Sequence, residues 1–217
     1  MEKITKAGIY DLPMEVYHSQ CCEGPSLSSS EARILTLTTP AHLPASRLAP
    51  SARSRPADLG TAIHALVLEP FHAESNIVVI KADSFRTGDA KDQAARAMNA
   101  NKTPLLVKDY EIAQRAADKL LAHPVMKSLL KEGDAEKSWF AKDRQTGIWV
   151  KARPDFVSAS GVMVDIKTVG DCTEEFIQRR MYEGGWFQQA PWHAHVYEGV
   201  KGQPISGYLW VCIEQEL

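Results

Sequence analysis

Two short apolar segments joined by a turn, between residues 151 and 168, restrict most strongly what this chain can fold into. Apolar residues flank the polar ones in both segments, as they do in half-buried β-strands. The sequence Ser-Ala-Ser-Gly at 158–161 is typical of a turn. The pattern therefore predicts two strands that pair with each other across this turn.

This predicted hairpin carries two carboxylates and one amine. Asp165 and Lys167 are two residues apart on the second strand, so their side chains point to the same face. If the strands pair, Asp155 comes close to Asp165, and burying both acids is costly unless a cation lies between them. Taken singly, an Asp-x-Lys strand is more often a solvated face and Arg-Pro-Asp a simple turn. Their combination after an apolar strand favours a catalytic role.

The length of 217 residues suits one α/β domain with a modest extension. We expect residues 1–58 to form an N-terminal extension and 59–217 the core. The chain has no run of about 18 apolar residues, and its first residues do not resemble a secretion signal. We therefore expect a cytoplasmic protein without a membrane partner. The net charge of −2 neither supports nor excludes binding to nucleic acid.

The N-terminal part should contain a helix and a basic loop. Ser28 or Ser29 is a suitable N-cap for a short helix that ends at Leu37. Residues 44–58 are rich in Pro, Ser, Ala and Arg, which predicts a mobile loop. This loop is either a plain connector or a flap that follows DNA phosphates. The candidate DNA contacts are Arg47, Arg53, Arg55 and, in the hairpin segment, Arg153.

A buried-looking helix should follow, capped by Asp58 and stopped by Pro70. His64 lies in its middle, where a histidine is by itself more often a core residue than a metal ligand. The remaining expected elements are strands near 76–80, 135–140 and 205–213, and helices near 89–100, 108–121, 121–130, 173–180 and 186–197.

Taken together, a series of short motifs resembles one family. In chain order the motifs are Tyr10-Asp-Leu-Pro13, Tyr17-His18, Leu27-Ser-Ser-Ser30, Gly60-x-x-x-His64-x-x-x-Leu68-Glu69-Pro70, Ala135-Glu136, Lys151-Ala-Arg-Pro-Asp155, Asp165-Ile-Lys167-Thr168 and Gln189-Ala-x-Trp192. The set resembles the catalytic domain of the RecE-type (exonuclease VIII) phage exonucleases, in the RecB-like branch of the PD-(D/E)xK nucleases. The resemblance covers nearly the whole chain.

The resemblance implies a restriction-endonuclease-like α/β fold, with a mixed central sheet flanked by helices. It also implies a Mg²⁺-dependent phosphodiesterase, with Mn²⁺ as a substitute ion. Such an exonuclease degrades one strand of linear duplex DNA from the 5′ end and leaves a 3′ overhang for recombination by a strand-annealing partner. The family's ring-shaped assembly implies a homo-oligomer, which the chain end at Leu217, expected to mark a truncated or minimal version, makes less certain.

By position, the resemblance makes His64, Asp155 and Asp165 metal ligands and Lys167 the catalytic lysine. Gln189 becomes the helix residue that supports the site, and His193, one turn later, stands where the family usually has Tyr.

The chemistry of phosphodiester hydrolysis fits this assignment. Carboxylate oxygens are ligands that Mg²⁺ prefers, and the backbone carbonyl of Ile166 could add another. Lys167 near a metal-bound water would orient it and favour its deprotonated form. Glu136 is expected either beside the acidic pair, as a further ligand or a supporting group, or as an ordinary edge-strand charge.

Two other interpretations stay open. One is a catalytically silent module of the same fold that binds DNA ends, which the slightly acidic charge and short C-terminus would suit. The other is an endonuclease or a Cas4-like nuclease without an iron–sulfur cluster. A cluster is not expected because only two late cysteines, Cys172 and Cys212, occur, and with Cys21 and Cys22 they should be reduced thiols.

Overall fold

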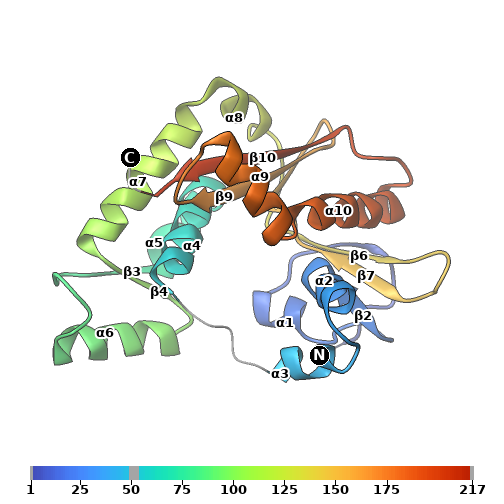
Figure 1. The fold of residues 1–217 in the computed structure, drawn as a ribbon, viewed down its shortest axis with the longest axis horizontal. Coiled ribbons are helices and arrows are strands. Elements are labelled where there is room, and N and C mark those ends of the chain that lie inside the picture. The colour runs from blue at the N-terminus through green and yellow to red at the C-terminus, as the bar shows by residue number, and fades with distance from the viewer. Residues whose placement is uncertain (1, 49–53, 216–217) are drawn as a thin grey trace. The chain divides into compact units, whose positions relative to one another are not determined.

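The computed structural model describes residues 2–48 and 54–215, which form two compact units. The first unit comprises Met1–Ser51, Asp134–Val164 and Thr173–Leu209, and the second comprises Ala52–Gly133, Asp165–Cys172 and Trp210–Leu217. The chain passes between the units several times, so neither is a continuous segment (Figure 1).

The first unit contains a four-stranded sheet in the order β1-β6-β7-β2. The antiparallel pairs are β1 with β6 and β6 with β7, whereas β2 and β7 are parallel. Because β1 and β2 come from the first 28 residues, the segment expected to be an N-terminal extension contributes two members of this sheet. The strands are β1 Gly8–Tyr10, β2 Ser26–Ser28, β6 Ser138–Lys142 and β7 Trp149–Ala152.

Helix α10 covers this sheet and closes a core of aromatic and aliphatic side chains. The Trp139 ring of β6 stacks on the Tyr197 ring of α10, with centroids 5.3 Å apart. Gly199 permits this close approach, because a Cβ built there would lie 2.6 Å from the Ala141 Cβ. The helices of the unit are α1 Met14–His18, α2 Ser29–Leu37, α3 His42–Leu48, α9 Glu174–Glu183 and α10 Trp186–Lys201.

Helix α2 begins where the sequence predicted. The Ser28 hydroxyl accepts from the Glu31 backbone N–H, and the Glu31 carboxylate accepts from the Ser28 N–H at 2.7 Å, so the two form a capping box. The loop expected at 44–58 was wrong for its first residues, because the chain up to Leu48 belongs to α3. Arg53 lies outside the described residues.

The predicted hairpin is confirmed as β8 Phe156–Ser158 and β9 Val162–Val169. The strands pair antiparallel, with Phe156 opposite Val164 and Val157 opposite Met163. Gly161 closes the turn with φ 80°, a conformation that glycine adopts without strain, and its N–H donates to the Ser158 carbonyl at 2.9 Å. The sheet order is β10-β9-β8-β5, with β5 Gly133–Ala135 and β10 Gly207–Glu214 at its edges.

The second unit is mostly helical. Helix α4 packs lengthwise against α7, and the parallel strands β3 and β4 are joined by the crossover helix α6 (Figure 1). Its elements are α4 Arg55–Leu68, α5 Pro70–Asn76, β3 Ile77–Ile80, α6 Gly88–Asn99, β4 Thr103–Leu106, α7 Val107–Ala122 and α8 Pro124–Leu129.

Two features of this unit differ from the sequence analysis. Helix α4 begins at Arg55 rather than at Asp58, because Ser54 is its N-cap. The Arg55 guanidinium also donates to the Asp109 carboxylate at 2.7 and 3.0 Å, which ties the starts of α4 and α7 together. Strand β4 was not predicted, because Pro104 interrupts a four-residue run and demotes a strand assignment.

The fold class is therefore confirmed: helices flank sheets of mixed strand direction. None of the helices within 2–48 and 54–215 combines the length and apolar character needed to cross a membrane.

Candidate functional site

Two acidic residues flank one cross-strand pair of the hairpin. Asp155 directly precedes Phe156, which pairs with Val164, and Asp165 directly follows Val164 on β9. Asp155 is half-buried, and its carbonyl accepts from the Glu136 backbone N–H at 3.0 Å. Asp155 and Asp165 therefore flank the same cross-strand pair, Phe156–Val164.

Glu136 is held next to Asp155 by an unusual backbone conformation. Its φ of 51° lies in the left-handed region, which separates β5 from β6 and makes the single strand expected at 135–140 wrong. The Glu136 carboxylate accepts from Arg153 Nε at 3.1 Å. Arg153 also donates to the Leu12 carbonyl and the Ser138 hydroxyl at 2.7 and 3.0 Å, so its guanidinium is engaged inside the first unit.

Asp165 and Lys167 form a close ion pair in the second unit. Asp165 is only 1% exposed, and the Lys167 ammonium lies 2.5 Å from its Oδ2 atom. Both side chains lie on one face of β9, as the two-residue spacing predicts. A buried carboxylate needs such a cationic partner, because removing one member leaves an uncompensated charge.

His64 reaches the peptide group between these two residues. Its Nε2 atom is 2.9 Å from the Ile166 carbonyl oxygen. At this distance the Nε2–H tautomer of His64 donates a hydrogen bond to the carbonyl, and the separation also equals the roughly 3 Å between adjacent ligands of an octahedral ion with bonds of about 2.1 Å. The hard oxygens of Asp165 and Ile166 fit the same ion. The residues therefore match a divalent-cation site, although imidazole is a less usual ligand for Mg²⁺ than oxygen.

Gly60, one turn before His64, sets the distance between α4 and β9. A Cβ built at Gly60 would lie 3.3 Å from the Thr168 hydroxyl oxygen. A side chain at residue 60 would crowd Thr168, so glycine favours the close approach of α4 to β9 that lets His64 reach the Ile166 carbonyl. The sequence signal for this contact is the spacing Gly60-x-x-x-His64.

Gln189 and His193 lie on α10 of the first unit, one turn apart. His193 is buried, and its Nδ1 atom lies 3.3 Å from the Tyr208 hydroxyl. Gln189 is half-buried. The neighbouring Trp192 donates its indole N–H to the Lys151 carbonyl at 3.0 Å, which fixes α10 against β7.

A polar cavity of about 690 Å³ opens in the first unit, and the sequence analysis did not identify it as one site. Its walls carry Lys151, Arg47, His18, Ser28 and Ser30. The buried Lys151 ammonium donates to the carbonyls of Tyr17 and Ser19 at 2.7 and 3.0 Å, and desolvation lowers its pKa.

Arg47 joins two walls of this cavity. Its Nε–H donates to the Glu31 carboxylate at 2.7 Å, and its Nη2 donates to the Ser26 carbonyl at 2.9 Å. His18 of the Tyr17-His18 motif and Ser28 and Ser30 of the Leu27-Ser-Ser-Ser30 motif line this cavity, so these motifs are the sequence signal that could have found it.

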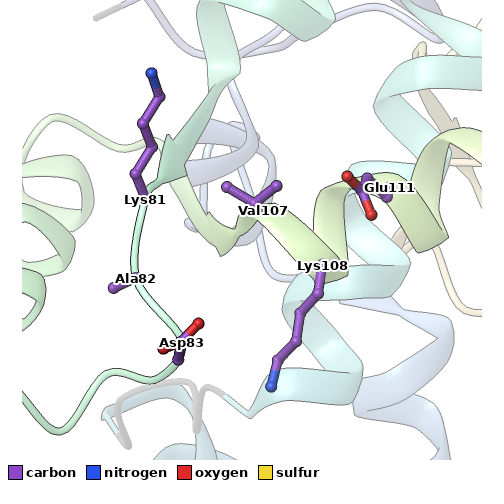
Figure 2. A pocket seen from close by; sticks show the side chains of 6 residues that line it. All are labelled: Lys81, Ala82, Asp83, Val107, Lys108 and Glu111. Atoms are coloured by element: carbon purple, nitrogen blue, oxygen red, sulfur yellow. The ribbon is translucent and has the colours of Figure 1, made fainter.

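A second cavity, of about 500 Å³, lies in the second unit beside the end of β3 and the start of α7 (Figure 2). Figure 2 shows that the ammonium groups of Lys81 and Lys108 point in opposite directions. Asp83 and Glu111 balance their charges. These side chains do not converge on a common ligand, so this cavity is not the stronger candidate.

Comparisons with known proteins agree with this fold. The chain superposes on a crystal structure described as a "Putative exonuclease" from Eubacterium rectale with a TM-score of 0.62 and 11% sequence identity. The match covers 95% of this chain and 74% of that one, and at this identity it shows the fold alone. No curated protein matches the chain.

A family model matches residues 28–205, from the start of α2 to just before β10. The matched range contains every predicted metal ligand as well as Lys167 and Gln189. It also contains the β8–β9 hairpin, in which Asp155 and Asp165 flank the Phe156–Val164 pair. The chain therefore belongs to the family of PDDEXK-like domains of unknown function, DUF3799.

Proposed function

We propose that this protein is a Mg²⁺-dependent nuclease that hydrolyses DNA phosphodiester bonds. The observation that carries the proposal is the buried Asp165 carboxylate with the Lys167 ammonium 2.5 Å away, on a strand whose neighbouring peptide carbonyl is contacted by His64. We include Asp155 in the proposed site because it and Asp165 flank the Phe156–Val164 pair of the hairpin. The family and the fold support nuclease chemistry.

In this proposal His64, Asp155, Asp165 and the Ile166 carbonyl hold the cation. A divalent ion held there would supply positive charge that stabilises the phosphoryl oxygens in the transition state. Lys167 orients the attacking water and favours its deprotonated form by its positive charge. Asp165 keeps the Lys167 ammonium in place through their ion pair. Supporting roles for Glu136 and Gln189 are part of the same proposal.

We further propose that the substrate is the end of linear duplex DNA. The first-unit cavity is lined by Lys151, Arg47 and three serines, which can donate to a phosphate, and also by the carboxylates of Glu15 and Glu31. The RecE-type resemblance adds further parts to this proposal. They are digestion from the 5′ end, a 3′ overhang for an annealing partner, and a homo-oligomeric, cytoplasmic enzyme.

The test uses the full chain with end-labelled linear and circular duplex DNA of the same sequence. We expect nucleotide release from the linear substrate with Mg²⁺, reduced by EDTA to background, and no cutting of the circle. Asp165→Asn and Lys167→Met should each lower the release rate by about 10²- to 10⁴-fold, because each removes part of the general-acid–base and metal machinery.

Matched controls come from the exposed face of α7. Asp118→Asn and Lys119→Met make the same chemical changes at exposed positions, and both variants should keep the wild-type rate. If Asp165→Asn or Lys167→Met cleaves DNA at the wild-type rate, the role proposed for that residue is wrong. Mg²⁺ binding to the wild type without any nucleotide release would instead support a DNA-end-binding module, and cutting of the circle an endonuclease.

A further inference from the structure

Helix α9 carries a row of aromatic and cationic side chains that continues onto α10. Phe176, Arg179 and Tyr182 follow at intervals of three, so they lie along one side of the helix. The Arg179 guanidinium lies over the Phe176 ring, 5.2 Å from its centroid. The Tyr182 ring stacks on Phe187, with centroids 5.5 Å apart and planes at 15°. We call these four residues the α9 ladder.

The α9 ladder is open to solvent. Tyr182 is 77% exposed and Phe187 is 46% exposed, and no residue of α9 is buried. Large aromatic side chains are usually withdrawn from water, and two of them held face to face at the surface indicate a binding surface. The flat outer faces of the stacked pair suit a ligand that is itself flat.

The turn beneath the stacked pair is fixed. Gly185 has φ 71°, and a Cβ built there would collide with the Arg33 side chain, so this position requires glycine. Arg33 donates to the Glu183 carbonyl at the end of α9, and Trp186 is buried at the start of α10. The two rings are therefore positioned before any ligand arrives, which lowers the entropy lost on binding.

The combination of aromatic rings with an arginine in the ladder fits a nucleic-acid strand. Arg179 provides a cation within the row, and combined aromatic rings and arginines are what single-stranded nucleic acids bind, by base stacking and phosphate contact. The charges on α9 are mixed: Arg179 and Arg180 stand beside Glu174, Glu175 and Glu183, and Glu183 directly follows Tyr182. A duplex would not serve, because its base faces are covered by neighbouring pairs.

We propose that the α9 ladder binds single-stranded DNA, stacking unpaired bases on Tyr182 and Phe187 while Arg179 contacts a phosphate. The proposal deepens the proposed nuclease function, because digestion of one strand of a duplex leaves the other strand unpaired.

The test measures binding of a fluorescein-labelled oligothymidine to the full chain by anisotropy, in EDTA so that no cleavage occurs. Tyr182→Ala and Phe187→Ala should each weaken binding about tenfold, and Tyr182→Phe, which keeps the ring, should stay within about twofold. Arg179→Gln should make the plot of log affinity against log salt concentration less steep by about 0.7, the change expected when one phosphate contact with a single strand is lost. The matched control is Phe71→Ala, which removes a 96% exposed ring on α5 and should change nothing.

An abasic oligonucleotide of the same length separates stacking from charge. Wild-type affinity for it should fall to the level that Tyr182→Ala shows for oligothymidine. Equal affinity of the wild type and Tyr182→Ala for oligothymidine overturns the proposal. It is also overturned if sedimentation shows that the wild type self-associates, that Tyr182→Ala does not, and that both bind DNA equally well, because the ladder is then a contact between copies of the chain. If binding of oligothymidine depends on Tyr182 and Phe187 but no DNA is cleaved in Mg²⁺, only the proposed nuclease function is contradicted. If DNA is cleaved but binding does not depend on these rings, only the role of the α9 ladder is contradicted.

Discussion

At the scale of single residues, the first-unit cavity combines several charged groups in a small space. His18 and Lys151 both line it, and Lys151 is almost fully withdrawn from solvent. Although much of the His18 ring is open to water, its partial burial and then the Lys151 ammonium lower its pKa. His18 is therefore neutral in the folded protein over a pH range in which the unfolded chain already binds a proton.

This difference gives a pH-dependent stability with a defined sign. The contribution of His18 is present above the unfolded pKa of about 6.5 and is lost as the pH falls through the lower folded pKa. We expect the free energy of unfolding of His18→Gln to fall less between pH 7.5 and 5.5 than that of the wild type. Urea titrations at both pH values measure it, with the exposed His42→Gln as control. Identical pH slopes for wild type and His18→Gln would contradict the prediction.

At the scale of elements, close packing without side chains decides how helices lie on strands. Gly199 brings α10 onto β6 because its Cβ would lie 2.6 Å from that of Ala141. Gly199→Ala should destabilise the protein by about 1–3 kcal/mol, the usual cost of overpacking. Gly88→Ala, at the first position of α6 with nothing within 4 Å of its Cβ, is the matched control and should be neutral or slightly stabilising. Thermal unfolding of both variants checks this, and equal melting temperatures would rule the packing argument out.

At the scale of the whole molecule, a cation bound by side chains from several elements links ligand binding to folding. At a Mg²⁺ concentration of 100 times Kd, binding to the native state alone stabilises it by about 2.7 kcal/mol. For a chain of this size that corresponds to a rise in melting temperature of about 5–10 °C. We expect Mg²⁺ to produce such a rise, EDTA to reverse it, and Asp165→Asn to abolish it. A rise that persists in Asp165→Asn would place the ion elsewhere.

Local patterns in the sequence were sufficient to predict several elements of this protein. The turn at 158–161, the alternation on either side of it and the spacing of Asp165 and Lys167 predicted the β8–β9 hairpin and the shared face of the ion pair. The helix from Ser29 to Leu37 followed from its N-cap. These features depend on residues within a few positions of one another, so periodicity and capping chemistry specify them.

The tertiary structure decided what depends on partners distant in the sequence. The parallel pairing of β2 with β7, the burial of Lys151 against the carbonyls of Tyr17 and Ser19, and the reach of His64 to the Ile166 carbonyl join segments more than 100 residues apart. No local pattern encodes such pairings, because the free energy that selects them comes from burying apolar surface and satisfying buried polar groups across the whole fold.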